Sequence, residues 1–430
     1  MDTLSLEQNP LLKDVVLPWP EELKGKRVPT IGLHLLVKNG ASCVGRLIDN
    51  VGPYIHEVGA VVNDTTDDTI SILEAKCKEH KLVLNVFDVT AKSHPGFYLL
   101  DVPETYSVGA PLDGETYEGP FTNKPLLADW AAVRNLGWTL LGSEWRLFMD
   151  VDDVMLDPES LPGLCLALEE RGVDMATGRY QFDVGSSKLV RSDGMRERLA
   201  LNTSAIRWFG KVHETLTGHE RVAHVEGNLL VVDRRDSTGA DVRVPGRCFK
   251  VLYHEGRSRD WNVSPRTLIY LAMECQTSMP RLASAAIDRY LERSTWKEER
   301  AWACAMRGEI CAARGDFKEA SSWFELALTE HPGVRSAMRL CYSRFQEQKW
   351  QEAIDAYSRG LVNKNIVQAL DNGPIFEDAC KILVAAAHRK LGHYDEALRV
   401  GREALAIFPN NDSLKKLVVE LESVAKKAKR

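Results

Sequence analysis

The chain has 430 residues, and its 55 lysines and arginines against 61 aspartates and glutamates give a formal net charge of -6 at pH 7. At roughly 100–200 residues per domain, this length indicates two or three domains. With 44% hydrophobic residues, the composition excludes a chain that is disordered throughout and a polycation that binds nucleic acid by bulk charge.

The cysteines and the N-terminus predict a cytoplasmic protein. The nine cysteines are scattered and form no C-x-x-C pair, which argues against a disulfide framework and against a zinc knuckle. The opening residues, MDTLSLEQNPLLKDVVLPWP, lack the basic-then-apolar pattern of a signal peptide. No run of about 18 apolar residues occurs, so no membrane partner is expected.

Apolar runs alternate with helical segments after a polar N-terminal extension over residues 1–27. The predicted strands are Thr30 to Val37, Glu57 to Val62 and Leu82 to Phe87, and the predicted helices are Ser42 to Val51 and Asp67 to His80. Strands and helices that alternate with short links are typical of a parallel α/β sheet with right-handed crossovers. We therefore expect a Rossmann-like, mostly parallel sheet in a domain over residues 28–262.

Residues 92–128 are rich in glycine, proline, tyrosine and acidic residues, and no element is predicted there. So long a segment is either a functional lid or binding loop, or a peripheral insertion. A helix is predicted from Asp129 to Gly142, with Asp129 as its N-cap.

Three carboxylates follow the next predicted strand, in the stretch RLFMDVDD. Asp150, Asp152 and Asp153 repel one another unless a cation lies between them, and a divalent metal is the obvious candidate. The carboxyl end of a strand is also where open α/β sheets bind ligands. A D-x-D pair alone is more typical of a solvated loop or a helix cap than of a metal site.

The chain changes character near residue 263, and a helical domain is predicted over residues 263–430. Ala320 and Ala353 are 33 positions apart, close to the roughly 34-residue period of tetratricopeptide repeats. One repeat has small, aromatic and terminating residues at the consensus positions: Gly308, Ala320, Phe324, Ala327 and Pro332. About three repeats are expected, or four if residues 266–293 form another, with a capping helix in the basic tail.

The order of several short motifs resembles glycosyltransferase family two, whose members have the GT-A fold. The motifs are IGLHLLVKNG, VVNDTTDDTI, WAAVRN, FMDVDD and RWFGKVHETL, followed by the repeats. The resemblance extends to the subgroup with C-terminal tetratricopeptide repeats, which includes the sublancin-type peptide S-glycosyltransferase. It implies transfer of a hexosyl or pentosyl group from a nucleoside diphosphate sugar, with a UDP-sugar as the expected donor and inversion as the expected outcome.

The resemblance also implies roles for single residues at the donor site. Asn63 and Asp64, with Asp67, stand where the family's D-D-G-S-x-D loop grips the nucleotide, although the glycine is missing and Asn63 replaces an acid. Arg134 matches the arginine of the A-R-N segment that approaches the donor, and its alternative is an ion pair on a helix surface. Asp150 is the member of the D-x-D pair expected near the nucleotide as well as the metal.

Metal binding and proton transfer are assigned to a second set of residues. Asp150 and Asp152 are expected to hold Mn²⁺ or Mg²⁺, with His213 as a further ligand or a catalytic group. Glu214, which completes V-H-E, is the first candidate for the general base, and Asp153 is the second. A His-Glu pair can also be purely structural. His254 is a further candidate from the end of the domain.

The acceptor is predicted from the repeats and from a basic cluster. Tetratricopeptide arrays bind peptides or self-associate, so a polypeptide acceptor is expected first, and a homodimer through the repeats is the other use of that surface. Cations beside an aromatic side chain could instead hold a hydroxymethylated pyrimidine of DNA, or form a solvated face. The cluster consists of Arg234, Arg235, Arg243, Arg247, Lys250, Arg257, Arg259 and Trp261.

Two other classes of function remain open at this point. A non-catalytic repeat scaffold with a degenerate transferase domain would be expected to have lost Asp150 and Asp152, which are both present. A nucleotidyltransferase or metal-dependent hydrolase could use D-x-D without the A-R-N and V-H-E motifs.

Overall fold

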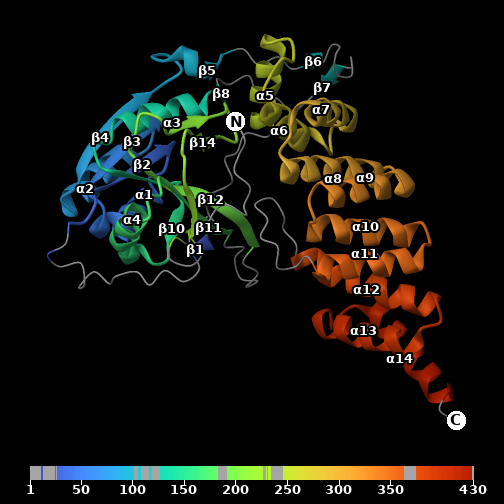
Figure 1. Ribbon diagram of the computed structural model, residues 1–430. Coiled ribbons are helices and arrows are strands. Elements are labelled where there is room, and N and C mark those ends of the chain that lie inside the picture. Colours follow the sequence, from blue (N-terminus) through green and yellow to red (C-terminus); the bar gives the residue numbers. More distant parts are fainter. Residues whose placement is uncertain are drawn as a thin grey trace. The chain divides into compact units, whose positions relative to one another are not determined.

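The computed structural model describes residues 11–12, 25, 27–100, 105–107, 116–118, 126–182, 191–225, 229, 231–233, 246–362 and 374–428. The chain forms two compact units (Figure 1). We call Met1–Ser107 with Thr116–Asn262 the α/β unit, and Val263–Arg430 the helical unit. No described helix is long and apolar enough to cross a membrane.

The α/β unit combines strands with five described helices. The strands are β1 (Leu11–Leu12), β2 (Ile31–Val37), β3 (Glu57–Asn63), β4 (Val83–Val89), β5 (Tyr98–Leu99), β6 (Thr105–Ser107), β7 (Thr116–Glu118), β8 (Leu126–Leu127), β9 (Trp145–Phe148), β10 (Asp153–Met155), β11 (Met175–Phe182), β12 (Arg191–Leu201), β13 (Arg207–Phe209), β14 (Thr215–Thr217), β15 (Val222–Val225) and β16 (Val231–Asp233). The helices are α1 (Val44–Val51), α2 (Thr69–Glu79), α3 (Trp130–Thr139), α4 (Leu161–Glu170) and α5 (Arg247–Ser258).

The main sheet is mixed and mostly parallel. Its strands follow the order β1-β15-β11-β12-β9-β2-β3-β4. The strands β9, β2, β3 and β4 are parallel, as predicted, because helices cross over between them. The mostly parallel sheet is as predicted, and its exception is β12, which is antiparallel to both β9 and β11.

Both faces of the central strands are covered, which explains their continuous apolar sequence. Leu33 and Leu35 of β2 belong to one core cluster with Leu47 of α1, Leu73 of α2 and Leu164 of α4. Helix α3 lies over the opposite face (Figure 1). A Cβ atom at its Gly137 would lie 2.3 Å from Cε1 of His34 on β2, so glycine allows helix and sheet to approach closely.

The segment over residues 92–128 contains more structure than predicted. It includes β5, β6, β7 and β8, where β5 pairs with β8 and β6 pairs with β7, both antiparallel. Tyr98 and Leu127 are buried in a cluster with Val61, Val89 and Val133. The two ends of the segment are therefore anchored by apolar packing that composition did not reveal.

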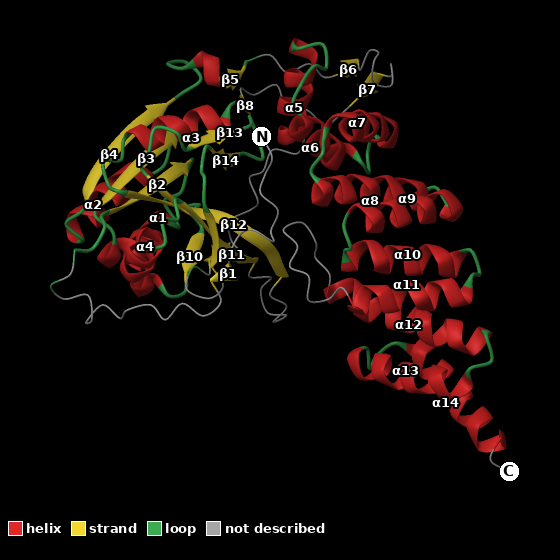
Figure 2. Cartoon of the chain, viewed as in Figure 1, coloured by secondary structure: helices red, strands yellow, loops and turns green. Residues whose placement is uncertain are grey.

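The helical unit consists of helices that pack in consecutive pairs (Figure 2). They are α6 (Pro265–Cys275), α7 (Pro280–Arg293), α8 (Lys297–Ala313), α9 (Phe317–Glu330), α10 (Val334–Gln346), α11 (Trp350–Val362), α12 (Pro374–Lys390), α13 (Tyr394–Ile407) and α14 (Asp412–Ala428). The pair α6 and α7 coincides with the expected fourth repeat, and α14 with the expected capping helix. Gly308 of α8 faces the ring of Phe324 of α9, where a Cβ would lie 2.7 Å from a ring carbon.

The cysteines differ in their access to solvent. Cys43, just before α1, and Cys248 of α5 are half-buried. The other seven are buried within the helices and cores of the two units.

Candidate functional site

The order of the strands reverses at β2, which lies between β3 and β9 in the sheet. From β2 the chain proceeds outward to β3 and β4, and then returns to β9 on the other side of β2. Open α/β sheets bind ligands outside the carboxyl ends of their strands at such a switch point. We call the carboxyl ends of β2, β3, β4 and β9, with the loops that follow them, the carboxyl edge.

The loops after β2 and β3 are joined by hydrogen bonds at this edge. Asn39 Oδ1 accepts from the backbone N–H of Thr66 at 2.8 Å, and Asp67 Oδ2 accepts from the N–H of Ala41 at 3.0 Å. Burial raises the pKa of Asp67, but hydrogen bonds from Thr69 and Ala41 outweigh it and hold that pKa below its usual value. Asp67, predicted to bind the nucleotide, thus braces the loop in this structure.

Asn63 and Asp64 lie where β3 ends, beside the end of β4. Asn63 is buried and accepts a hydrogen bond from the hydroxyl of Tyr98. Asp64 has a positive φ of 44°, its N–H donates to the carbonyl of Val89 at 3.1 Å, and its Oδ1 accepts from the N–H of Ala91 at 3.3 Å. Both residues, which were predicted to bind the nucleotide, are therefore held at the carboxyl edge by hydrogen bonds to neighbouring segments of the same unit.

Arg134 of α3 supplies a buried cation at the same edge. Its Nε donates to Glu214 Oε1, and its Nη2 lies 3.8 Å from Asp150 Oδ1. The guanidinium lies 4.2 Å from the ring centre of Phe148 and 5.2 Å from that of Trp208, and among the described residues its Nη1 has no hydrogen-bond partner. The structure thus brings together three predicted site residues from α3, from the end of β9 and from the loop before β14.

Asn135 explains why the A-R-N and R-W-F-G-K-V-H-E motifs occur in one chain. Its Nδ2 donates to the carbonyl of Trp208 at 2.9 Å, and its Oδ1 accepts from the N–H of Trp208 at 2.9 Å. The N–H of Trp130 also donates to the carbonyl of Lys211 at 2.8 Å. These bonds attach α3 to the hairpin of β13 and β14, and so hold Arg134 against Glu214.

The three aspartates after β9 occupy different environments. Asp150 is 47% exposed, and Asp152 lies in the turn that follows. Asp153 is fully buried, and its carboxylate accepts from the hydroxyl of Tyr180, from Nη1 of Arg198 and from the N–H of Asp150. Burial raises the pKa of Asp153, Arg198 opposes this rise and Asp150 adds to it. This position suits a brace for the turn better than a base that must touch an acceptor.

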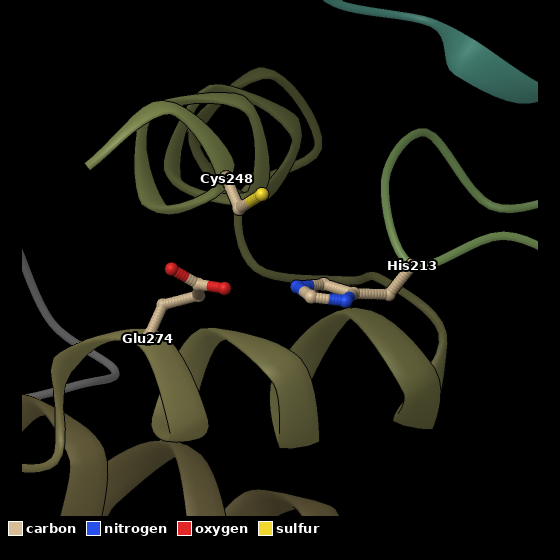
Figure 3. A group of neighbouring side chains, drawn as sticks. All are labelled: His213, Cys248 and Glu274. Atoms are coloured by element: carbon tan, nitrogen blue, oxygen red, sulfur yellow. The ribbon is translucent and has the colours of Figure 1, made fainter. Parts of the chain in front are cut away.

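The predicted ligand set of Asp150, Asp152 and His213 does not occur as a close group of three in the described part of the chain. In the described part of the chain, no group of three ligand atoms within 4.8 Å includes Asp150 or Asp152. His213 lies in the turn between β13 and β14 with a φ of 52°, beside Cys248 of α5 (Figure 3). Histidine and cysteine alone supply fewer ligands than a structural zinc site requires.

The described members of the basic cluster do not form one surface. Lys250 and Trp261 are buried, and Trp261 packs against Gly256, so this indole is not available to stack on a base. Arg247 lies 4.5 Å from the ring centre of Trp130, and Arg259 lies 3.6 Å from Glu255. Burial, with a smaller effect of Lys211, lowers the pKa of His254. Arg234, Arg235 and Arg243 lie outside the described residues.

Two residues with a clear place at the site carry no local sequence signal. Tyr180 of β11 and Arg198 of β12 contact Asp153 from 27 and 45 positions away in the chain. Arg198 does not stand out in the sequence, because it is one of three arginines in the strand RSDGMRERLAL.

Comparisons with known proteins bear on the helical unit. Residues 380–411 match the model of the tetratricopeptide repeat, so the C-terminal part of the chain contains this repeat. No curated protein matches the chain.

Several solved structures are similar to part of the chain. A crystal structure of the MamA protein has 17% identity and a TM-score of 0.31, over 37% of this chain and 79% of MamA. YrrB, a tetratricopeptide protein, has 14% identity and a TM-score of 0.35, over 41% and 85% of the two chains. The repeat domain of Arabidopsis OM64 has 15% identity and a TM-score of 0.25, over 30% and 98%.

Proposed function

We propose that the α/β unit is a metal-dependent glycosyltransferase with the GT-A fold. It would transfer a sugar from a nucleoside diphosphate sugar, with UDP as the expected nucleotide, to a polypeptide. The observation that carries the proposal is the convergence of Arg134, Asp150 and Glu214 at the switch point of the sheet. The motif order of the family-two glycosyltransferases and the strand order β4-β3-β2-β9 with an antiparallel β12 support it.

The residues at the carboxyl edge suit a diphosphate leaving group. Arg134 is a fixed cation with its Nη1 unpartnered among the described residues, and aromatic rings exclude water around it. Asp150 and Asp152 offer the oxygen ligands that Mg²⁺ and Mn²⁺ prefer. Such an ion would stabilise the charge that develops on the leaving diphosphate.

Glu214 is the residue to which we assign the general base. As the acceptor attacks the anomeric carbon, the carbon–oxygen bond to the diphosphate breaks, and the carboxylate of Glu214 takes the acceptor's proton. In the ligand-free structure, this carboxylate accepts a hydrogen bond from Arg134. A diphosphate that attracts Arg134 would release it. We assign Asp153, whose buried carboxylate already accepts three hydrogen bonds, to support of the turn instead.

A polypeptide is the acceptor that the repeats favour. Tetratricopeptide arrays present extended surfaces that bind other proteins, and residues 380–411 match this repeat. The alternative acceptor, a hydroxymethylated pyrimidine in DNA, loses one supporting feature because Trp261 is buried.

The first experiment is calorimetric titration of the full chain with a panel of nucleotide sugars, with and without Mn²⁺. We expect binding of one donor that requires the metal, and strong loss of turnover in Asp152→Asn. The acceptor is then sought by mass spectrometry after incubation with a peptide library and with DNA that contains modified pyrimidines. Full activity of Asp152→Asn in the presence of chelator would reject the metal-dependent mechanism, and a chain that binds no donor would favour the scaffold alternative.

A further inference from the structure

We infer that Arg198 and Tyr180 are positioning residues for the metal-binding turn. They hold Asp153, and through it the backbone of residues 150–153, at the carboxyl end of β9. The effect of this clamp on catalysis rests on the proposed function, whereas its effect on the turn does not.

Arg198 links the end of β9 to the turn that follows. It lies on β12, in which Leu199 is paired with Leu147 of β9. Its Nη1 donates to the carbonyl of Phe148 at 3.3 Å and to Asp153 Oδ2 at 3.2 Å. The side chain is buried, and its guanidinium lies 4.7 Å from the ring centre of Tyr180 and 5.6 Å from that of Phe148. One nitrogen atom thus fixes both ends of the segment that carries Asp150.

Asp153 closes the turn from both directions. Its Oδ2 accepts from the N–H of Asp150 at 2.9 Å, while its own N–H donates to the carbonyl of Asp150 at 3.1 Å. Tyr180 occupies the remaining oxygen, Oδ1, at 2.9 Å. The turn therefore has one buried carboxylate, that of Asp153, which is held by three donors, whereas Asp150 and Asp152 are only partly buried.

This arrangement resolves the repulsion among the three carboxylates. Arg198 compensates the charge of Asp153 inside the protein. The repulsion that remains is mainly between Asp150 and Asp152, which a divalent cation can reach from the solvent and relieve. Residues that orient metal ligands without touching the metal typically change its affinity by about 10–100-fold when they are replaced. We therefore expect Arg198 to act on metal binding and not on the acceptor.

The test uses a double variant, because Arg198→Met alone would leave Asp153 buried and unpaired. Arg198→Met/Asp153→Asn removes both charges together, which a fold tolerates better. Arg198→Lys is the rescue variant, since a single ammonium can donate to both acceptors of Nη1. The matched control is Arg146→Met, because Arg146 is another buried arginine of the same sheet, packed on Trp138 at 4.7 Å.

Binding of Mn²⁺ with UDP is measured by calorimetry for each variant, and the amide exchange of residues 150–153 is followed by mass spectrometry. The double variant should lose about 10–100-fold in Mn²⁺-dependent UDP affinity, Arg198→Lys should regain part of it, and the control should bind like the parent. Amide exchange of the turn should accelerate in the double variant alone.

The two hypotheses fail in different ways. If the parent binds neither UDP nor any nucleotide sugar of the panel in the presence of Mn²⁺, the proposed function is wrong, and amide exchange alone then decides the clamp. Parent-like exchange of residues 150–153 in the double variant, or parent-like Mn²⁺-dependent UDP affinity, would overturn the positioning role.

Discussion

At the scale of single residues, Arg134 contacts the carboxylates of both Asp150 and Glu214. Under the proposed function, this shared cation would link donor binding to the state of Glu214. Glu214→Gln removes the proton acceptor while it keeps the size of the side chain. We expect kcat to fall by about 10²–10⁴-fold. Donor affinity should be equal or higher, because Arg134 loses a competing anion.

This prediction is checked by UDP release under saturating donor and by calorimetry. The exposed Glu220→Gln on the following loop is the matched control and should leave both quantities unchanged. A Glu214→Gln enzyme with parental kcat would exclude this residue as the base.

A separate prediction concerns the pH dependence of stability and rests on His34 of β2. It is fully buried, and burial, together with the charge of Arg134, lowers its pKa from 6.5 to about 3. Below pH 6.5, His34 becomes protonated in the unfolded chain, whereas it stays neutral in the folded protein. As the pH is lowered below 6.5, the free energy of unfolding should therefore decrease by about 1.4 kcal/mol per pH unit, until the pH nears the pKa of His34 in the folded protein. Above pH 6.5, His34 should have no effect on the pH dependence of stability.

Urea unfolding of the parent and of His34→Leu at a series of pH values measures this contribution. The variant should show a shallower decline of stability below pH 6.5. Parallel curves for the two proteins would mean that the residue is protonated in the folded state as readily as in the unfolded state.

The residue scale is also where prediction from sequence was least complete. The stretch RLFMDVDD located the three carboxylates after β9, but the sequence alone did not show that Asp153 is buried while Asp150 is partly exposed. What distinguishes them is the contact with Tyr180 and Arg198, and these partners are set by the pairing of β11, β12 and β9. Pairing over such separations is determined by the whole sheet and leaves no local pattern.

At the scale of elements, helix α3 carries the cation of the site and packs on the sheet through Gly137. A Cβ at that position would lie 2.3 Å from His34 Cε1 and 2.9 Å from Val61 Cγ2. Gly137→Ala gains about 1 kcal/mol of helix propensity but overpacks the interface, which costs about 1–3 kcal/mol. We expect net destabilisation and weaker donor binding, since the helix must move away with Arg134.

The matched control for this change is Gly142→Ala. Among the described residues other than its chain neighbours, none has a heavy atom within 4 Å of a Cβ at Gly142. The substitution should therefore be neutral or stabilise by roughly 0.4–1 kcal/mol through the unfolded chain. Urea unfolding compares the two variants. Equal stability of Gly137→Ala and the parent would show that α3 can shift at no cost.

The predicted elements of the sheet correspond closely to those observed, because uninterrupted apolar runs between turn residues are a strong signal for buried strands. The helix expected from Asp129 to Gly142 is α3, and Asp129 caps it by accepting from the N–H of Ala132 at 2.9 Å. The antiparallel β12 and the strands within residues 92–128 were missed. Their sequences are polar or short, and their partners lie far along the chain.

At the scale of the whole molecule, the two units have separate cores. We expect two calorimetric unfolding transitions. UDP with Mn²⁺ at about 100 times its Kd should stabilise the α/β unit by about 2.7 kcal/mol and leave the helical unit unchanged. The helical transition serves as the internal control, and a common shift of both transitions would mean that the units unfold as one.

The repeats were predictable because their period recurs in sequence, and residues 380–411 match the repeat model. The irregular spacing before the last repeat coincides with residues 363–373, which lie outside the described part of the chain. The acceptor could not be predicted in the same way, since recognition by repeats depends on side chains that the packing consensus leaves variable.

The unequal burial of the cysteines gives the protein its own labelling sites. A thiol-reactive dye added to the native chain should react first at Cys43 and Cys248, which are half-buried, and both of these belong to the α/β unit. Cys43 precedes α1, close in sequence to the loop after β2, and Cys248 lies on α5. A donor and an acceptor fluorophore could thus report motions within one unit without an engineered cysteine, while the seven buried thiols would react only as the chain opens.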